Sequence, residues 1–101
     1  MIYTSKVKRF DWDEAKNKKL QQERDVSFED IVVSINEGRL LTVLVHPDQK
    51  KYPNQKVFVV EINKYAYLVP FVENSEKIFL KTIIPSRKAT RDYVVKGEKK
   101  R

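Results

Sequence analysis

The clearest candidates for chemistry in this sequence are two arginines near its C-terminal end. Arg87 and Arg91 stand four residues apart, and Ser86 before them is a residue type that caps helices. A helix that begins there places both guanidinium groups on one face, where their planar forks can bind phosphate oxygens in pairs. Lys81 and Lys88 would support this face. The pattern predicts a phosphate-binding surface, although a solvated basic helix face without catalytic duty explains it equally well.

Side chains that can transfer a proton are also present, namely Tyr93, Tyr67, Glu61 and His46. Histidine titrates near neutral pH, but His46 precedes Pro47 at the end of a predicted strand, where ordinary surface histidines are common. A tyrosine needs neighbouring cations that favour its ionised form, and Arg87 and Arg91 would supply them to Tyr93.

The composition excludes several kinds of site. The 101 residues include no cysteine, one histidine and two glycines. Disulfides and thiolate metal sites are therefore excluded, and a histidine-rich metal centre or a glycine-rich phosphate loop is not expected. Asp11 and Asp13 fit helix capping better than metal binding. We expect no cofactor and no metal, and the lack of a long apolar stretch predicts a cytoplasmic protein without membrane contact.

The positive charge gathers at the two ends of the chain. The formal net charge is +7. Residues 1–24 hold seven basic and four acidic residues, residues 25–80 hold six and eight, and residues 81–101 hold eight and two. Such a field attracts phosphate polyanions or an acidic protein, and charge alone does not separate these partners.

These residues must be positioned by an α+β fold, which we expect to be one domain over residues 1–101. A short strand at residues 8–10 leads into a helix with Asp11 as N-cap and Glu14 at N3. This helix should end near Arg24, bury Trp12, Ala15 and Leu20, and carry Lys16 on its wide polar face.

A second N-terminal helix has the strongest local signals in the chain. Ser27 is its predicted cap, Asp30 occupies N3, and Val26 can pack on Ile31 across the first turn. Gly38 suits the left-handed position that ends a helix. The residues that we expect it to bury are Phe28, Ile31, Val32 and Ile35.

From residue 40 the hydrophobic period changes to two, which predicts a four-stranded, mainly antiparallel sheet. The strands are expected at residues 40–46, 56–62, 65–72 and 77–84. Asn63-Lys64 is a plausible two-residue hairpin turn. Pro70 cannot donate to a ladder, so we expect a bulge or an unpaired position there.

Alternation divides the strand residues between two faces, although a bulge would invert the assignment. The helix-facing set is expected to be Leu41, Val43, Val45, Phe58, Val60, Ile62, Ala66, Leu68, Val72, Ile78, Leu80 and Ile84. The opposite face would mix Thr42, His46, Glu61, Tyr65, Tyr67, Lys77 and Lys81 with Leu40, Leu44, Val57, Val59, Val69, Phe71, Phe79 and Ile83. A ligand would lie on this mixed polar and aromatic face.

The last predicted element is a helix from Ser86 to about Val95. Arg87 and Arg91 would share one of its faces, and Ala89 and Tyr93 another. The basic tail at residues 97–101 is expected to be disordered.

Two separated motifs resemble a known family. Phe10-Asp11-Trp12-Asp13 with Lys16, followed by Val26-Ser27-Phe28-Glu29-Asp30, resembles the opening of the BrnT-type toxins. The segment from Thr82 through Ile84-Pro85-Ser86-Arg87 to Tyr93 resembles their closing strand and helix. Leu20 and Glu23-Arg24-Asp25 depart from the family pattern, which indicates a divergent member of the wider RelE-like superfamily.

The resemblance implies a metal-independent endoribonuclease, the toxin of a type II toxin–antitoxin pair, neutralised by a cognate antitoxin. Such cleavage needs a base, an acid and cations that stabilise the phosphorane. The catalytic candidates are then Arg87, Arg91, Lys81, Tyr93, Glu61 and Tyr67. The expected RNA contacts are Lys88, Lys16, Lys77, Tyr65 and His46. RNA, free or on the ribosome, would be the substrate, and the alternative is a non-catalytic RNA-binding or protein-interaction module.

Overall fold

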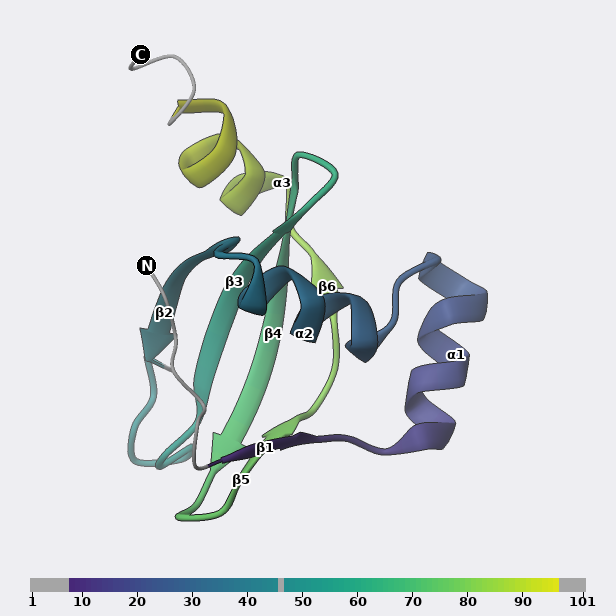
Figure 1. The fold of residues 1–101 in the computed structure, drawn as a ribbon. Coiled ribbons are helices and arrows are strands. Elements are labelled where there is room, and N and C mark those ends of the chain that lie inside the picture. The colour runs from purple at the N-terminus through teal and green to yellow at the C-terminus, as the bar shows by residue number, and fades with distance from the viewer. Residues whose placement is uncertain (1–7, 46, 97–101) are drawn as a thin grey trace.

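The computed structural model describes residues 8–45 and 47–96 of the 101-residue chain. The helices are α1 (Glu14–Arg24), α2 (Phe28–Asn36), α3 (Arg87–Ala89) and the π-helix η1 (Thr90–Val95). The strands are β1 (Arg9–Asp11), β2 (Leu40–Val45), β3 (Lys56–Ile62), β4 (Tyr65–Glu73), β5 (Lys77–Leu80) and β6 (Ile84–Pro85). The predicted mixed α+β class is confirmed, with α1 beside the sheet and α2 across it (Figure 1). His46 and the predicted tail at residues 97–101 lie outside the described residues.

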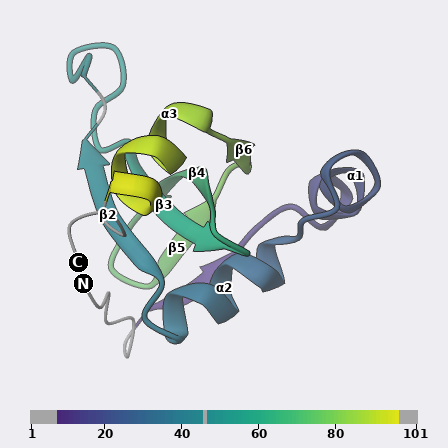
Figure 2. The same ribbon diagram turned by 90° about the horizontal axis from the view of Figure 1, so that it is seen from above.

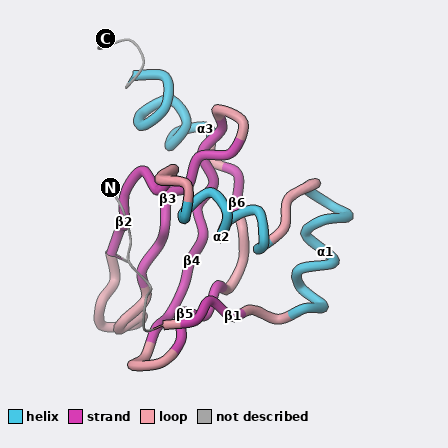
Figure 3. The backbone as a smooth tube through the Cα atoms, viewed as in Figure 1, coloured by secondary structure: helices cyan, strands magenta, loops and turns pink. Residues whose placement is uncertain are grey.

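The sheet is larger than the four strands that the sequence predicts. Its order is β1-β5-β4-β3-β2, with β6 also paired to β4. β1 runs parallel to β5, whereas the other pairings are antiparallel. The N-terminal strand therefore closes one edge, at residues 9–11 rather than 8–10 (Figure 3).

The predicted strand at residues 77–84 is divided in two. β5 pairs Leu80 with Phe71, but β6 pairs Ile84 with Leu68, so the register against β4 shifts by one residue in between. Pro70 stays in register with Val57 on β3, so β4 has no bulge there, but Pro70 has no register partner in β5 or β6, which agrees with the predicted unpaired position. The irregularity falls on the partner segment instead, where the Lys81 N–H donates to the Pro70 carbonyl at 2.8 Å. Pro70 can accept this bond although it has no N–H to donate.

The first helix begins two residues later than its predicted cap. Asp13, not Asp11, is the N-cap, and its side chain accepts the N–H of Ala15 at 2.9 Å. Asp11 instead accepts the N–H of Trp12. The buried members are Asn17 and Leu20, whereas Ala15 is exposed and Trp12 precedes the helix. The polar surface is therefore even wider than predicted.

The second helix follows its local signals. The Asp30 N–H donates to Ser27 Oγ at 3.1 Å, and the Ser27 N–H donates to Asp30 Oδ2 at 3.0 Å, which is the predicted capping box. Gly38 adopts a φ of +84° just after the helix, a conformation that an L side chain rarely adopts. Ser34 is buried, whereas Val32, which was predicted to be buried, is only half-buried.

Asn17 joins the two N-terminal helices. Its side chain is 1% exposed; its Oδ1 accepts the Phe28 N–H at 2.8 Å and its Nδ2 donates to Glu29 at 2.7 Å. The Phe28 ring, which α2 carries into the core, also stacks on Trp12 with 5.6 Å between centroids. These contacts fix α1 to the start of α2.

The sheet has two differently covered faces. The inner face packs against α2, and the fully buried strand residues there are Phe58, Val60, Val69, Phe71, Ile78 and Leu80. On the other side, called the outer face, Val59 and Ala66 pack against Ala89 and Val94 of the C-terminal segment. Figure 2 shows α2 and this segment on opposite sides of the sheet.

The predicted division of the faces is wrong for β4. Asn63 and Lys64 form the predicted turn, with φ of 52° and 64°. A two-residue turn pairs Ile62 with Tyr65, so Tyr65, Tyr67, Val69 and Phe71 lie on the inner side while Ala66 and Leu68 lie on the outer side. The one-residue shift after β5 likewise buries Ile83 and exposes Ile84. A register shift between residues 40 and 42 places Leu40, not Leu41, in the main core.

Candidate nucleic-acid interface

The predicted phosphate-binding arginines lie on the final helix of the described chain. α3 and η1 are continuous, and we call them together the C-terminal helix. Ser86 caps it as predicted, because its Oγ accepts the N–H of Ala89 at 3.0 Å. Arg87, Lys88 and Arg91 are all exposed on this helix.

The C-terminal helix is bound to the sheet through Ala66 on β4. The Ala66 N–H donates to Thr90 Oγ1 at 2.8 Å, and the Ser86 N–H donates to the Ala66 carbonyl at 3.0 Å. The Thr90 hydroxyl itself donates to the Ser86 carbonyl at 2.8 Å. Ser86 and Thr90 therefore hold the start of the helix against one strand residue. Hydroxyl residues four apart at a helix start were the available sequence signal for this attachment, which sequence analysis missed.

The π-helical turns change which side chains face the sheet. Ala89 and Val94, five residues apart, are 7% and 5% exposed, whereas Tyr93 is 39% exposed. Ala89 and Tyr93 were predicted to share one face, as α-helical spacing requires. The wider π-turn substitutes Val94 for Tyr93 against the sheet and leaves the Tyr93 ring accessible.

A groove runs between the C-terminal helix and the outer face. Its volume is about 300 Å³, and its lining residues are Leu44, Leu68, Ser86, Lys88, Ala89, Asp92 and Tyr93. Tyr93 and Asp92 bring polar atoms to it, and Lys88 brings a cation. An aromatic ring beside a cation is an arrangement that can contact a base and its phosphate.

Asp92 organises the charges beside this groove. Arg91 Nε lies 3.2 Å from Asp92 Oδ1, and Lys96 Nζ lies 3.7 Å from the same oxygen. The hydrogen bond from Arg91 lowers the pKa of Asp92 below its usual value, so this carboxylate stays ionised at neutral pH. No acidic group among residues 8–45 and 47–96 forms an ion pair with Arg87 or Lys88. These two cations remain available to an anion.

Of the six predicted catalytic residues, Tyr93 alone lines this groove. Arg87 and Arg91 lie on the same helix outside the lining, and the other three lie elsewhere. Tyr67 packs at the inner face and borders a different cleft, of about 390 Å³, between α2 and the β3–β4 turn. Tyr65 contacts Tyr67 edge to face, with 5.6 Å between ring centroids. Glu61 is paired with Ala66 and so lies on the outer side, half-buried, but it forms no described bond to Arg87 or Arg91. Of the predicted proton-transfer groups, only Tyr93 is in the groove within the described chain.

The remaining predicted residues are spread over the molecule. Lys81 is exposed beside Pro70, at the side of the outer face. Lys77 lies at the start of β5 and pairs with Asp11 at 3.7 Å, and Lys16 is half-buried on α1. The predicted set therefore divides between the C-terminal helix, the inner cleft and distant basic positions.

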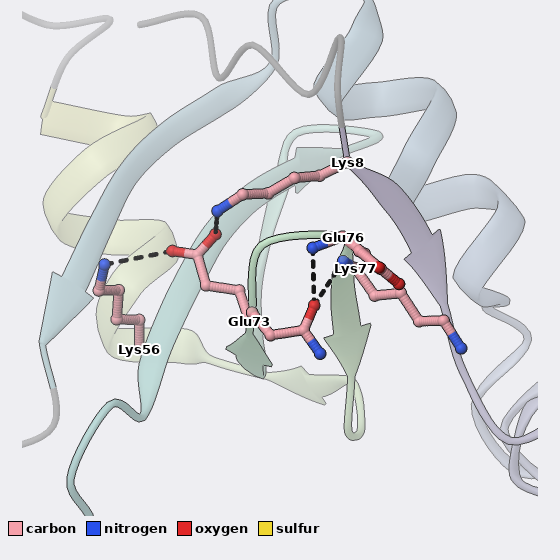
Figure 4. A network of polar contacts seen from close by, with 6 residues as sticks. Lys8, Lys56, Glu73, Glu76 and Lys77 are labelled. Carbon is pink, nitrogen blue, oxygen red and sulfur yellow. Dashed lines mark hydrogen bonds and ion pairs between the residues drawn. The ribbon is translucent and has the colours of Figure 1, made fainter.

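A second group of basic residues is neutralised within the fold. At the end of β4, Glu73 binds Lys8 at 2.8 Å and Lys56 at 3.3 Å (Figure 4). Asn74 Oδ1 accepts the N–H groups of Glu76 and Lys77, each at 2.8 Å, which shapes the adjoining turn. Lys8 fastens the N-terminal strand to β4 and Lys56 links β3 to β4, so both are poorer candidates for phosphate contacts than Arg87 and Lys88.

The described chain has two further negative features. It contains no group of three or more His, Cys, Asp or Glu side chains that could hold a metal ion. No helix in residues 8–45 and 47–96 has the length and apolar character needed to cross a membrane.

Comparison with known proteins adds no relative: no family model, no curated protein and no solved structure matches this chain.

Proposed function

We propose that this chain is the toxin of a type II toxin–antitoxin pair, a divergent BrnT-type endoribonuclease that cleaves RNA without a metal in the cytoplasm. The observation that carries the proposal is the exposure of Arg87, Lys88 and Arg91 on one helix beside the groove that contains Tyr93. The order of elements supports it, because two N-terminal helices precede an antiparallel sheet and a C-terminal helix. An acidic antitoxin would neutralise this basic surface.

Each charged or polar residue of the C-terminal helix has a distinct role in this proposal. Arg87 and Lys88 bind the scissile phosphate and stabilise the charge that develops on the phosphorane. Arg91 contributes to the same field while Asp92 holds its guanidinium at 3.2 Å. Tyr93 exchanges a proton with the ribose hydroxyl or the leaving oxygen. RNA reaches them either free or on the ribosome.

A non-catalytic RNA-binding module is the second candidate. It is favoured by the separation of Tyr67, on the inner cleft, from the basic helix on the other side of the sheet. Within the described residues, Tyr93 is then the one predicted proton-transfer group in the groove. A binding module needs only the cations and an accessible ring.

The test is cleavage of purified total RNA, in EDTA, with and without ribosomes. Wild-type protein is compared with Arg87→Ala/Arg91→Ala and with the matched control Lys18→Ala/Lys19→Ala, which removes two exposed charges from α1. Circular dichroism checks that all three proteins fold. Cleavage by the wild type and the control but not by the arginine variant supports the ribonuclease. A folded wild type that binds RNA and leaves it intact in both settings contradicts it and favours the binding module.

A further inference from the structure

Part of the outer face carries an apolar surface beyond the end of the C-terminal helix. Strand register places Leu44 beside Val57, Val57 beside Pro70, and Val72 beside Phe79. These five residues alternate with the inner-face core, so they lie on the same side as Val59 and Leu68, which the C-terminal helix contacts. The helix therefore covers only one end of a face that continues across four strands.

The exposure of this surface differs sharply from that of the inner face. Leu44 is 39% exposed and Phe79 is 36% exposed, while Val57, Pro70 and Val72 are partly exposed. Their inner-face neighbours Phe58, Phe71 and Leu80 are fully buried. A sheet normally buries an apolar face against another element, and the described chain provides none here. The groove at Leu44, Leu68 and Tyr93 extends the surface beneath the C-terminal helix.

Basic side chains border this surface on two sides. Arg87 and Lys88 lie in the first turn of the C-terminal helix, where Lys88 lines the groove, and the exposed Lys81 donates its backbone N–H to the Pro70 carbonyl. None of the three forms an ion pair within residues 8–45 and 47–96. A partner that covers the apolar residues would place the residues at its own edges next to these cations.

We propose that the outer face binds an amphipathic helix of a partner protein, with an apolar stripe seated on Leu44, Pro70 and Phe79 and acidic residues on both flanks. Carboxylates there would pair with Lys81, Arg87 and Lys88, and burial of the apolar stripe would supply the affinity. The role of this contact as inhibition rests on the proposed function, since a helix beside Tyr93 would also block RNA.

The charge and chemistry of the surface argue against two other occupants. In a dimer, two copies that each carry a net charge of +7 would face each other. The same basic residues of both copies would then lie close together and repel. RNA would gain from the cations, but most of this surface is aliphatic: Leu44, Val57 and Val72 offer no flat ring, and Phe79 is the one aromatic side chain among the five residues on which a base could stack.

Binding of a defined peptide tests the proposal. The probe is a labelled, helix-forming peptide of about 18 residues, with leucines along one stripe and glutamates on both flanks. Its control is a scrambled peptide of the same composition, and anisotropy at about 0.15 M salt measures affinity without depending on ribonuclease activity. Leu44→Ser/Phe79→Ser alters the proposed surface. Val33→Ser, at a 53% exposed position on α2, is the matched control.

We expect the scrambled peptide and the Leu44→Ser/Phe79→Ser protein each to lower affinity about tenfold or more, and Val33→Ser to change it by less than about twofold. Equal binding of the two peptides, or no loss in the double variant, overturns the proposal. So does a concentration-dependent dimer that Leu44→Ser/Phe79→Ser dissociates, because the face would then belong to a second copy. An equal loss of affinity for single-stranded RNA in that variant assigns the face to RNA and also overturns it. Peptide binding by a protein that never cleaves RNA leaves this proposal standing and rejects only the ribonuclease.

Discussion

The Ala66 N–H donates to Thr90 Oγ1 at 2.8 Å, and this bond attaches the helix that carries the basic residues to the middle of the sheet. Ala66 is fully buried, so its N–H has no access to water if the hydroxyl is removed. Since the Thr90 hydroxyl also donates to Ser86, the position of Arg87 depends on a residue that carries no charge.

Replacement of Thr90 by valine should therefore loosen the helix without changing its shape. The variant leaves the buried Ala66 N–H unsatisfied, and the expected loss is about 1–3 kcal/mol in the free energy of unfolding. Urea denaturation measures it. Thr90→Ser keeps the hydroxyl and should retain most of the stability; equal losses in both variants would show that the hydroxyl contributes no more to stability than the methyl group does.

Asn17 should contribute a similar free energy to the stability of the fold, at the junction of α1 and α2. Asn17→Leu removes the acceptor of the buried Phe28 N–H, and we expect a loss of about 1–3 kcal/mol in the free energy of unfolding. Asn36→Leu makes the same change at an exposed position of α2 and should cost much less. Indistinguishable denaturation midpoints for the two variants would show that the Asn17 contacts contribute little.

The same asparagine gives the stability an acid dependence. The hydrogen bond from Asn17, with a smaller backbone contribution, lowers the pKa of Glu29 from 4.5. A carboxyl whose folded pKa is depressed stabilises the fold above its unfolded pKa and loses that contribution as the pH falls through the folded value. The free energy of unfolding of Glu29→Gln should therefore fall less steeply than that of the wild type as the pH decreases below 4.5. Parallel stability curves for the two proteins would contradict this role.

The sequence predicted best those features that depend on neighbouring residues. Ser27 with Asp30, and the turn at Asn63-Lys64, behave as predicted because each is a local hydrogen-bonding or backbone preference. Faces of β4 were misassigned because alternation was continued across a turn that pairs Ile62 with Tyr65. That error placed Tyr67 on the face predicted to bind a ligand, whereas the observed register places it on the opposite side of the sheet from the candidate groove.

Other features depend on contacts that a linear pattern does not contain. The one-residue shift opposite Pro70 arises from the pairing of β4 with two different segments. Asn17 carries no sequence signal that separates it from the other polar residues of its helix, although it is buried and bonded to Phe28 and Glu29. The π-turn that exposes Tyr93 follows from the packing of Val94 on the sheet, not from a helix signal.

RNA binding should depend on salt through the C-terminal helix. If Arg87 and Lys88 each contact one phosphate, Arg87→Ala/Lys88→Ala should lower the slope of log affinity against log salt by roughly 1.4 for single-stranded RNA. Lys18→Ala/Lys19→Ala removes the same charge from α1 and should leave the slope nearly unchanged. Equal slope changes in both variants would indicate a diffuse electrostatic effect instead of a localised interface.

Tyr93→Phe separates catalysis from binding in the groove. The phenylalanine keeps a ring in the groove that Leu44 and Lys88 also line, but it has no hydroxyl to exchange a proton. If Tyr93 transfers the proton, cleavage should fall by at least about 100-fold while RNA affinity changes by less than about twofold. Tyr52→Phe, in the loop at residues 47–55, is the matched control and should cleave normally. Full cleavage by Tyr93→Phe would require the proton to come from another group, whereas a parallel loss of affinity would make the hydroxyl a binding contact.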